Sequence, residues 1–142
     1  MNKSVEDRYC YNNYVVIRLI QEWEKYGRII IAYDFDNTVF DYHGVGDTFP
    51  RVISLLRRAK ELGAYLILTT CCDDSEIPRI REYLERNNIP CDIINDNAPF
   101  IPFKSRKIYY NLLLDDRAGL PSASDDLELA MDLIESRRRK EA

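Results

Sequence analysis

Hydrophobic residues in this chain gather in short unbroken runs, separated by longer segments with a helical repeat. Three of the runs have no polar face, which is typical of strands buried on both faces of a parallel sheet. The first opens the segment 28–40, the second covers residues 64–70, and the third covers residues 109–114. A shorter apolar run at residues 91–94 predicts a further strand.

The segment before the first strand carries apolar positions at helical spacing. Residues 4–26 predict a long amphipathic helix, with Ser4 as its N-cap and Gly27 at its end. Its acidic first turn and its apolar stripe are formed by Glu6, Asp7, Tyr9, Val16, Leu19, Ile20 and Trp23. We expect this helix to pack on the sheet rather than to bind a partner.

Three further helices are expected later in the chain. One covers residues 50–62, and another begins in a capping cluster at residue 73 and ends near residue 87. The last is capped by Ser122 or Ser124 and reaches the basic run 137–140, whose charges suit the C-terminal end of a helix.

The alternation of strands and helices predicts an α/β fold. Right-handed crossovers would place helices on both faces of a central parallel sheet, giving a three-layer Rossmann-like architecture. At 142 residues the chain is expected to form one domain, 1–142, that buries a core without metal or disulfide. Its parts are an N-terminal helix at 1–27, a core at 28–120 and a C-terminal helix at 121–142.

Acidic and hydroxyl side chains stand where the expected strands end. Asp34 and Asp36 follow the first strand, Thr70 follows the second, and Asp115 and Asp116 follow the last. The carboxyl ends of parallel strands meet at one edge of an α/β sheet, which is where ligands bind. Paired carboxylates there are costly unless they hold a cation or take part in chemistry.

The segment 34–38, with the sequence DFDNT, resembles the DxDxT signature of the haloacid-dehalogenase (HAD) superfamily of phosphoryl-transfer enzymes. The later segments follow the order of that family's motifs: first a strand that ends in Thr, then a lysine, and then a strand that ends in two acids. The resemblance covers about residues 28–120. The loops at 41–48 and 95–106 are too short for the family's large cap domains. The chain therefore looks like a small capless member with a HAD-like fold, loosely similar to the 5′-nucleotidase branch.

The resemblance implies a Mg²⁺-dependent phosphatase that works through an aspartyl-phosphate intermediate. In this scheme Asp34 is the nucleophile, and Asp36 protonates the leaving group before it takes a proton from the attacking water. Mg²⁺ would be bound by Asp34, Asp116 and the backbone carbonyl of Asp36, while Asp115 orients the lysine or a metal-bound water. Asp36 also argues against the dehalogenase branch, which differs at this position.

Contacts to a phosphorylated substrate are expected from residues next to the strand ends. Thr70 can hydrogen-bond a phosphoryl oxygen, and Asn37 and Cys71 are further candidates for substrate binding. An open site admits phosphorylated proteins, nucleic-acid ends or sugar conjugates, so the identity of the substrate stays open.

Two lysines before the last strand are candidates for the positive charge that phosphoryl transfer needs. Lys107 is favoured because residues 105–108, followed by a strand and an acid pair, resemble the same stretch of small HAD proteins. Lys104 is the alternative, because a chain that descends before it climbs the last strand would keep an earlier residue near the site.

The composition limits which binding partners and which cellular compartment we expect. The net charge of −4 argues against nucleic-acid binding as the main role, although a local basic patch can survive an acidic total. No apolar run reaches the length of a membrane span and no signal peptide opens the chain, so we expect a cytoplasmic protein. The four cysteines lack CxxC spacing and the single His43 cannot complete a zinc site, which predicts reduced thiols.

Other interpretations use the same residues. A HAD-fold regulatory or binding domain without significant turnover would keep the fold alone. A receiver domain also combines Asp, Thr, Lys and Mg²⁺, but there the acid pair follows the first strand and the phosphorylated Asp follows the third. A purely structural metal site would not require Thr70 or a lysine. The oligomeric state is left open.

Overall fold

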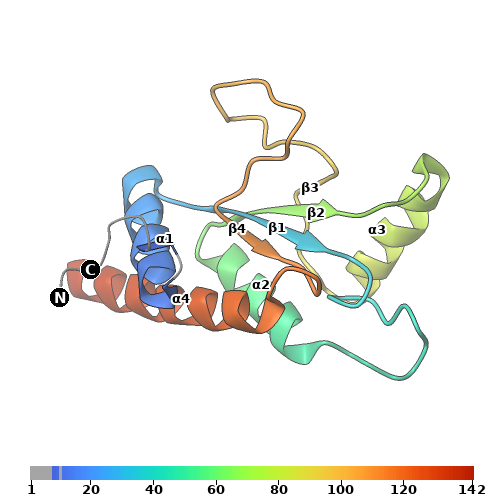
Figure 1. Cartoon of the computed structure of the whole chain (residues 1–142), viewed down its shortest axis with the longest axis horizontal. Coiled ribbons are helices and arrows are strands. Elements are labelled where there is room, and N and C mark those ends of the chain that lie inside the picture. Colours follow the sequence, from blue (N-terminus) through green and yellow to red (C-terminus); the bar gives the residue numbers. More distant parts are fainter. Residues whose placement is uncertain (1–7, 10) are drawn as a thin grey trace.

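The computed structural model describes residues 8, 9 and 11–142, and in this part of the chain four parallel strands form one sheet with the order β3-β2-β1-β4. The strands are β1 (Ile30–Asp34), β2 (Tyr65–Thr69), β3 (Ile93–Ile94) and β4 (Leu112–Leu114). The helices are α1 (Asn12–Tyr26), α2 (Pro50–Glu61), α3 (Ile77–Arg86) and α4 (Leu120–Glu141), with a 3-10 turn, η2 (Asp74–Glu76), before α3. The expected Rossmann-like α/β fold with a parallel sheet is confirmed (Figure 1).

One face of the sheet carries the main core. Ile29, Ile31 and Tyr33 point to this face and pack in a single cluster with side chains from all four helices. The largest fully buried members include Trp23 of α1, Leu56 of α2 and Leu127 and Met131 of α4. Burial of these side chains supplies the main driving force for folding.

The opposite face is covered by a loop and not by helices. Ile30 and Ala32 point there and pack with Ala98, Ile101 and Ile108, which belong to the connection between β3 and β4. No helix residue of the described chain belongs to this second cluster, so the expectation of helices on both faces is wrong. Figure 1 shows the connection rising from the sheet on the side away from α2 and α4.

The composition of this connection explains why it is not a helix. Pro99 and Pro102 lie in its first half, where each removes a backbone donor and opposes helical geometry.

Helix α1 confirms part of the prediction for the N-terminal segment. Val16, Leu19, Ile20 and Trp23 are buried, and Gly27 ends the helix with φ 77°. The expected cap at Ser4, the acidic turn at Glu6 and Asp7, and Cys10 lie outside the described residues. Tyr9 is 60% exposed and so does not belong to the apolar stripe.

Several boundaries differ from the expectation. Helix α1 begins at Asn12 rather than at residue 4, and strand β3 covers only Ile93–Ile94 of the expected 91–94. Strand β4 begins at Leu112 rather than at residue 109. At Asn111 the backbone N–H still donates to the Ile30 carbonyl at 2.8 Å, but the N–H of Ile30 donates to the Asn111 side chain and not to a backbone carbonyl. Helix α4 begins at Leu120 after Gly119, so Ser122 and Ser124 are not its caps and Ser124 is buried inside it. Proline in the first turn is suited to such a start.

Two smaller expectations concern thiols and membranes. Cys71, Cys72 and Cys91 are free thiols, as predicted for these three. Among the residues that the structure describes, no helix combines the length and the apolar character that crossing a membrane requires.

Candidate functional site

The sheet brings the acidic strand ends to one edge. Asp34 pairs with Thr69 in the register of β1 and β2, and Tyr33 pairs with Leu114 in that of β1 and β4. The residues that follow therefore leave the sheet side by side. Carboxylate oxygens of Asp34, Asp115 and Asp116 lie within 4.8 Å of one another.

The setting of the site shifts the pKa values of Asp34 and Asp36. Burial, followed by the neighbouring Asp116 and Asp115, raises the pKa of Asp34 to about 7. Burial also raises the pKa of Asp36, with added repulsion from Glu76 and Asp116. A strongly shifted carboxyl in a hollow is the physical mark of a functional site.

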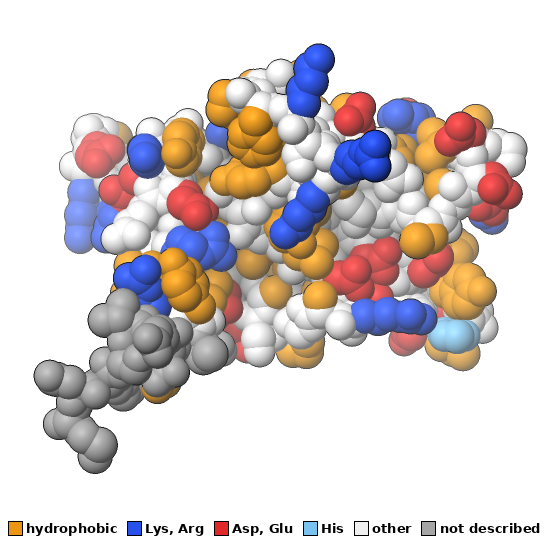
Figure 2. All heavy atoms as spheres, turned by 45° about the horizontal axis from the view of Figure 1, so that its top comes forward, with side chains coloured by type: hydrophobic (Ala, Val, Ile, Leu, Met, Phe, Trp, Pro, Cys, Tyr) orange, Lys and Arg blue, Asp and Glu red, His pale blue; other side chains and the backbone are white. Residues whose placement is uncertain are grey.

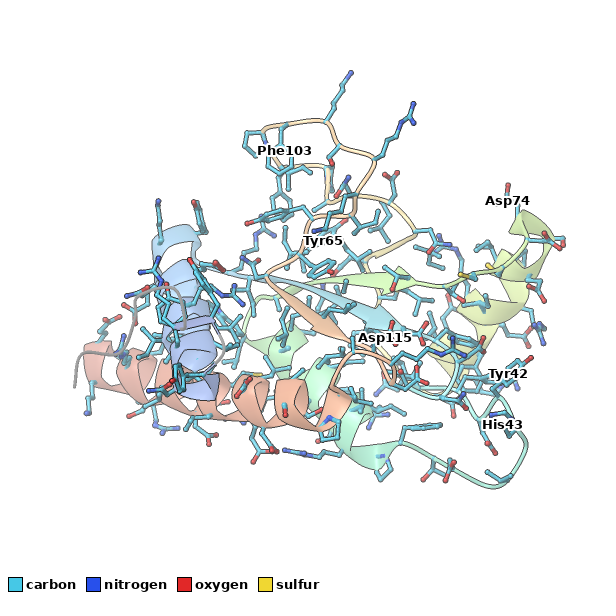
Figure 3. All side chains as sticks on the ribbon, in the orientation of Figure 1. Tyr42, His43, Tyr65, Asp74, Phe103 and Asp115 are labelled. Atoms are coloured by element: carbon cyan, nitrogen blue, oxygen red, sulfur yellow. The ribbon has the colours of Figure 1, made fainter. Side chains whose placement is uncertain are left out.

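The hollow in front of the carboxylates has a volume of about 400 Å³. It is lined by Asp34, Asp36, Asn37, Tyr42, His43, Cys71, Asp115, Asp116 and Arg117. Two of the expected substrate-binding residues, Asn37 and Cys71, are therefore at the site. Figure 3 shows Tyr42 and His43 at the same end of the sheet as Asp115.

A tight turn after β1 positions Asp36. The carbonyl of Phe35 accepts from the backbone N–H groups of Thr38, Val39 and Phe40, at 3.3, 3.1 and 3.0 Å. The rings of Phe35 and Phe40 stack with centroids 4.9 Å apart, and Tyr83 packs edge-on against both. The turn is thus anchored in the core, which holds the carboxylate of Asp36 at the rim.

Thr38 is a residue whose role the sequence did not reveal. It is fully buried, and its hydroxyl accepts from the backbone N–H of Asp116 at 3.2 Å and lies 3.5 Å from a carboxylate oxygen of the same residue. Thr38 therefore joins the turns after β1 and β4. Its place as the threonine of the DxDxT pattern was the available signal.

Thr70 is held at the edge but not in the hollow. Its backbone N–H donates to the side chain of Asn95 at 2.8 Å, and Asn95 donates back to the Thr70 carbonyl at 2.8 Å. Thr69 donates to the carbonyl of Tyr33, so it faces the sheet as expected. Asn95 was also missed from sequence, and its position directly after a short apolar strand was the only signal.

The expected lysines lie elsewhere. Neither Lys104 nor Lys107 lines the carboxylate hollow; Lys107 lines a separate groove on the connection between β3 and β4. The cation that does line the hollow is Arg117. Its guanidinium makes no ion pair with any residue of the described chain, while its backbone N–H donates to Asp115 at 2.9 Å.

The donor set of the site fits a hard divalent cation. Asp34, Asp115 and Asp116 offer only oxygen ligands, and none has a positively charged partner among the described residues. Burial, and after it the neighbouring Asp116 and Asp115, raises the pKa of Asp34, and a bound cation would favour the charged carboxylates. Mg²⁺ takes one or two carboxylates and completes its shell with water.

Comparisons with known proteins bear on the fold alone. No protein-family model matches the chain, and no curated protein matches it. One similar solved structure is that of a conserved protein coded by a locus of Bacteroides thetaiotaomicron, with 24% sequence identity and a TM-score of 0.57. The match covers 78% of this chain and 92% of that chain. At this identity the likeness supports the Rossmann-like architecture and says nothing of activity.

Proposed function

We propose that this chain is a Mg²⁺-dependent phosphomonoester hydrolase of the HAD type, working through an aspartyl-phosphate on Asp34. The observation that carries the proposal is the gathering of Asp34, Asp115 and Asp116 at one sheet edge, with Asp36 on the adjoining turn. Mutually repelling carboxylates in an open hollow cost stability, and a role in phosphoryl transfer accounts for all of them.

The chemistry divides between the first two acids. An oxygen of Asp34 attacks phosphorus, the bond from phosphorus to the leaving oxygen breaks, and Asp36 gives that oxygen its proton. Water then attacks the phosphorus, Asp36 accepts a proton from the water, and the bond to Asp34 breaks to release inorganic phosphate. The raised pKa of Asp36 suits a group that is protonated when the substrate arrives.

The remaining acids serve the cation. Asp34, Asp116 and the backbone carbonyl of Asp36 would hold Mg²⁺, with Asp115 orienting its neighbours or adding an oxygen. When bound, the ion neutralises the charge that the carboxylates and the phosphoryl oxygens share. Thr38 keeps Asp116 in place through its contact with the backbone of that residue.

A positive side chain is also needed on the phosphoryl group. Lys107 remains our first proposal and Lys104 the second, and neither lines the hollow in this structure. Arg117 is a third source that already lines the hollow. The three can be separated by mutation.

The hollow is open to large substrates. The segment 41–48 that borders it is short, and Asp41 braces it by accepting from the backbone N–H groups of Val45 and Gly46, at 3.2 and 2.7 Å. Nothing in the described chain forms a cap domain over the carboxylates.

Phosphate release by the purified protein tests the proposal. Phosphorylated metabolites, nucleotides, oligonucleotides and phosphopeptides should be assayed with Mg²⁺ and with EDTA, and we expect Mg²⁺-dependent hydrolysis of at least one class. Binding of phosphorylated ligands without any release would instead support a HAD-fold binding domain.

A further inference from the structure

The connection between β3 and β4 closes on itself as a compact loop over residues 97–109. At its neck the side chain of Asn97 donates to the carbonyls of Ser105 and Lys107, at 3.1 and 3.4 Å, and accepts from the N–H of Tyr109 at 2.7 Å. Loops whose ends meet in this way are frequently functional. We call residues 97–109 the Asn97 loop.

The underside of the Asn97 loop is fixed on the sheet. Ala98 is 2% exposed and packs with Ile101 and Ile108 against the strands. Pro99 and Pro102 restrict the backbone between these contacts. The loop is therefore organised before any partner arrives, so little ordering entropy opposes binding.

The outer side of the loop carries aromatic rings. Phe100, Phe103 and Tyr109 are 43%, 47% and 39% exposed. Together with Tyr26 and Arg28 they border a hollow of about 300 Å³, separate from the carboxylates. The Arg28 guanidinium lies over the Phe100 ring, 4.1 Å from its centroid. Exposed rings around a hollow are a common mark of a ligand surface.

Positive charge gathers on the same surface. Residues 97–114 contain Lys104, Arg106 and Lys107 and no acidic residue, in a chain whose net charge is −4. Within the described chain, none of these three nor Arg28 has a carboxylate partner. Figure 2 shows Lys and Arg side chains standing among hydrophobic ones on this face.

We infer that the Asn97 loop binds single-stranded nucleic acid. Aromatic side chains that stack on bases, interleaved with cations that follow the backbone, are the recurring design of such surfaces. The hollow beside Phe100 and Phe103 would take a base, and Arg106 with its neighbouring lysines would contact phosphates.

The loop and the carboxylates share one side of β1. Ile30 borders the aromatic hollow, and it points to the same face as Asp34, because residues an even number apart in a strand do so. Ile30 and Asp34 are four residues apart along the strand, which corresponds to about 13 Å. If the proposed phosphatase activity holds, on which this step rests, a bound strand can present a terminal phosphate to Asp34.

The aromatic rings favour a nucleic acid over an acidic peptide. Cations alone would attract any polyanion, whereas the rings that border the hollow add stacking contacts that a nucleic-acid base makes and an acidic side chain does not. The negative charge elsewhere on the molecule would confine such binding to this face.

Fluorescence anisotropy with a labelled oligothymidylate that lacks a terminal phosphate tests the inference, in EDTA so that no turnover occurs. We expect binding that weakens with salt, with a slope of about −0.7 in log K against log salt for each contacting cation. Arg106→Ala should lower that slope by about 0.7, while Lys140→Ala, the same charge change at the end of α4, should not alter it.

A substitution at Phe103 tests the stacking contact. Phe103→Ala should weaken binding about 5- to 150-fold, the range for loss of one base-stacking ring. Phe103→Tyr keeps a ring and should bind nearly as wild type, which separates stacking from a loss of folding. Phe103→Ala should leave hydrolysis of p-nitrophenyl phosphate unchanged.

The outcomes separate the two proposals. Hydrolysis of small phosphate esters without oligothymidylate binding would overturn the inference and leave the phosphatase standing. Binding with the Phe103 and Arg106 signature but without any hydrolysis would support the inference and overturn the phosphatase. Equal binding of poly-glutamate would overturn the nucleic-acid assignment.

Discussion

Polar side chains at the two ends of the sheet differ in whether they have hydrogen-bond or ion-pair partners. At the amino end, Asn111 is 9% exposed and fully paired. The side chain of Asn111 accepts from the N–H of Ile30 at 2.6 Å and donates to Glu22 at 2.8 Å. The backbone carbonyl of Asn111 accepts from Arg18 at 3.2 Å. Arg18 and Glu22 also form an ion pair, so α1 is joined to β1 and β4 by one closed network.

At the carboxyl end the acids have no such compensation. Asp34, Asp115 and Asp116 lie together and form no ion pair with a described residue, and burial together with the neighbouring acids raises the pKa of Asp34 to about 7. A paired polar network specifies and stabilises a fold, whereas unpaired charges at a sheet edge reduce stability. The contrast identifies the amino end as a structural network, and it is the reason that we propose the carboxyl end as the ligand site.

The largest effect is expected at the carboxyl end. Asp34→Asn should lower phosphate release by about 10⁴-fold or more, because an amide is a poor nucleophile. It should leave the melting temperature of the metal-free protein unchanged or higher, since one of three repelling charges is gone. Activity above a few per cent, in a preparation free of wild type, would show that Asp34 is not the nucleophile.

The source of positive charge should give the next largest effect. Lys107→Ala should cost about 2–4 kcal/mol in transition-state stabilisation, measured from kcat/KM, and Lys104→Ala well under about 1 kcal/mol. Arg117→Ala is the decisive comparison, because Arg117 lines the hollow and the lysines do not. If Arg117→Ala is the crippling change and Lys107→Ala is mild, the lysine assignment fails and the site uses an arginine.

Much of the carboxyl end could be predicted from the sequence because its signals are local. An apolar run followed by an acid marks both a strand and its end, and parallel strands must meet at one edge. Asp34, Asp36, Asp115 and Asp116 all lie at this edge for that reason.

The remaining features depend on contacts between distant parts of the chain. Thr38 touches Asp116 across 78 residues, and Asn111 replaces a ladder bond to Ile30 across 81 residues. Neither partner is visible in a local pattern. The loop that covers one face was expected as a loop, but not as the cover of that face, because helix-rich α/β folds supply the usual expectation.

The amino end should respond in stability and not in catalysis. Asn111→Ala leaves the buried N–H of Ile30 without its acceptor and removes one donor from Glu22, which keeps its ion pair with Arg18. The loss should lower the free energy of unfolding by about 2–3 kcal/mol. Asn87→Ala, which removes one exposed hydrogen bond at the end of α3, should cost less than about 1 kcal/mol. Urea denaturation measures both. A larger loss for Asn87→Ala would contradict the structural role of the amino end.

Proton binding offers a more specific comparison. The pKa of Asp34 is about 7 in the folded protein against an ordinary 3.8, so between these values the folded state holds a proton that the unfolded chain has released. In EDTA this contribution makes stability fall as pH rises through that window, with no further change above it. Glu135, whose pKa is lowered by Arg58, contributes with the opposite sign. The difference between wild type and Asp34→Asn isolates the Asp34 contribution, and parallel pH profiles would refute it.

Binding of Mg²⁺ should give the smallest shift. At ten times its dissociation constant the ion should stabilise wild type by about 1.4 kcal/mol, because it binds only the folded site, and by less below pH 7 where protons compete. Asp116→Asn should lose more of this gain than Asp115→Asn, since one oxygen of Asp115 already accepts from the N–H of Arg117 at 2.9 Å. Asp73→Asn, an exposed carboxylate outside the hollow, should keep the full shift. If Asp115→Asn loses more of the shift than Asp116→Asn, the two acids exchange roles as metal ligands, and the fold assignment is unaffected.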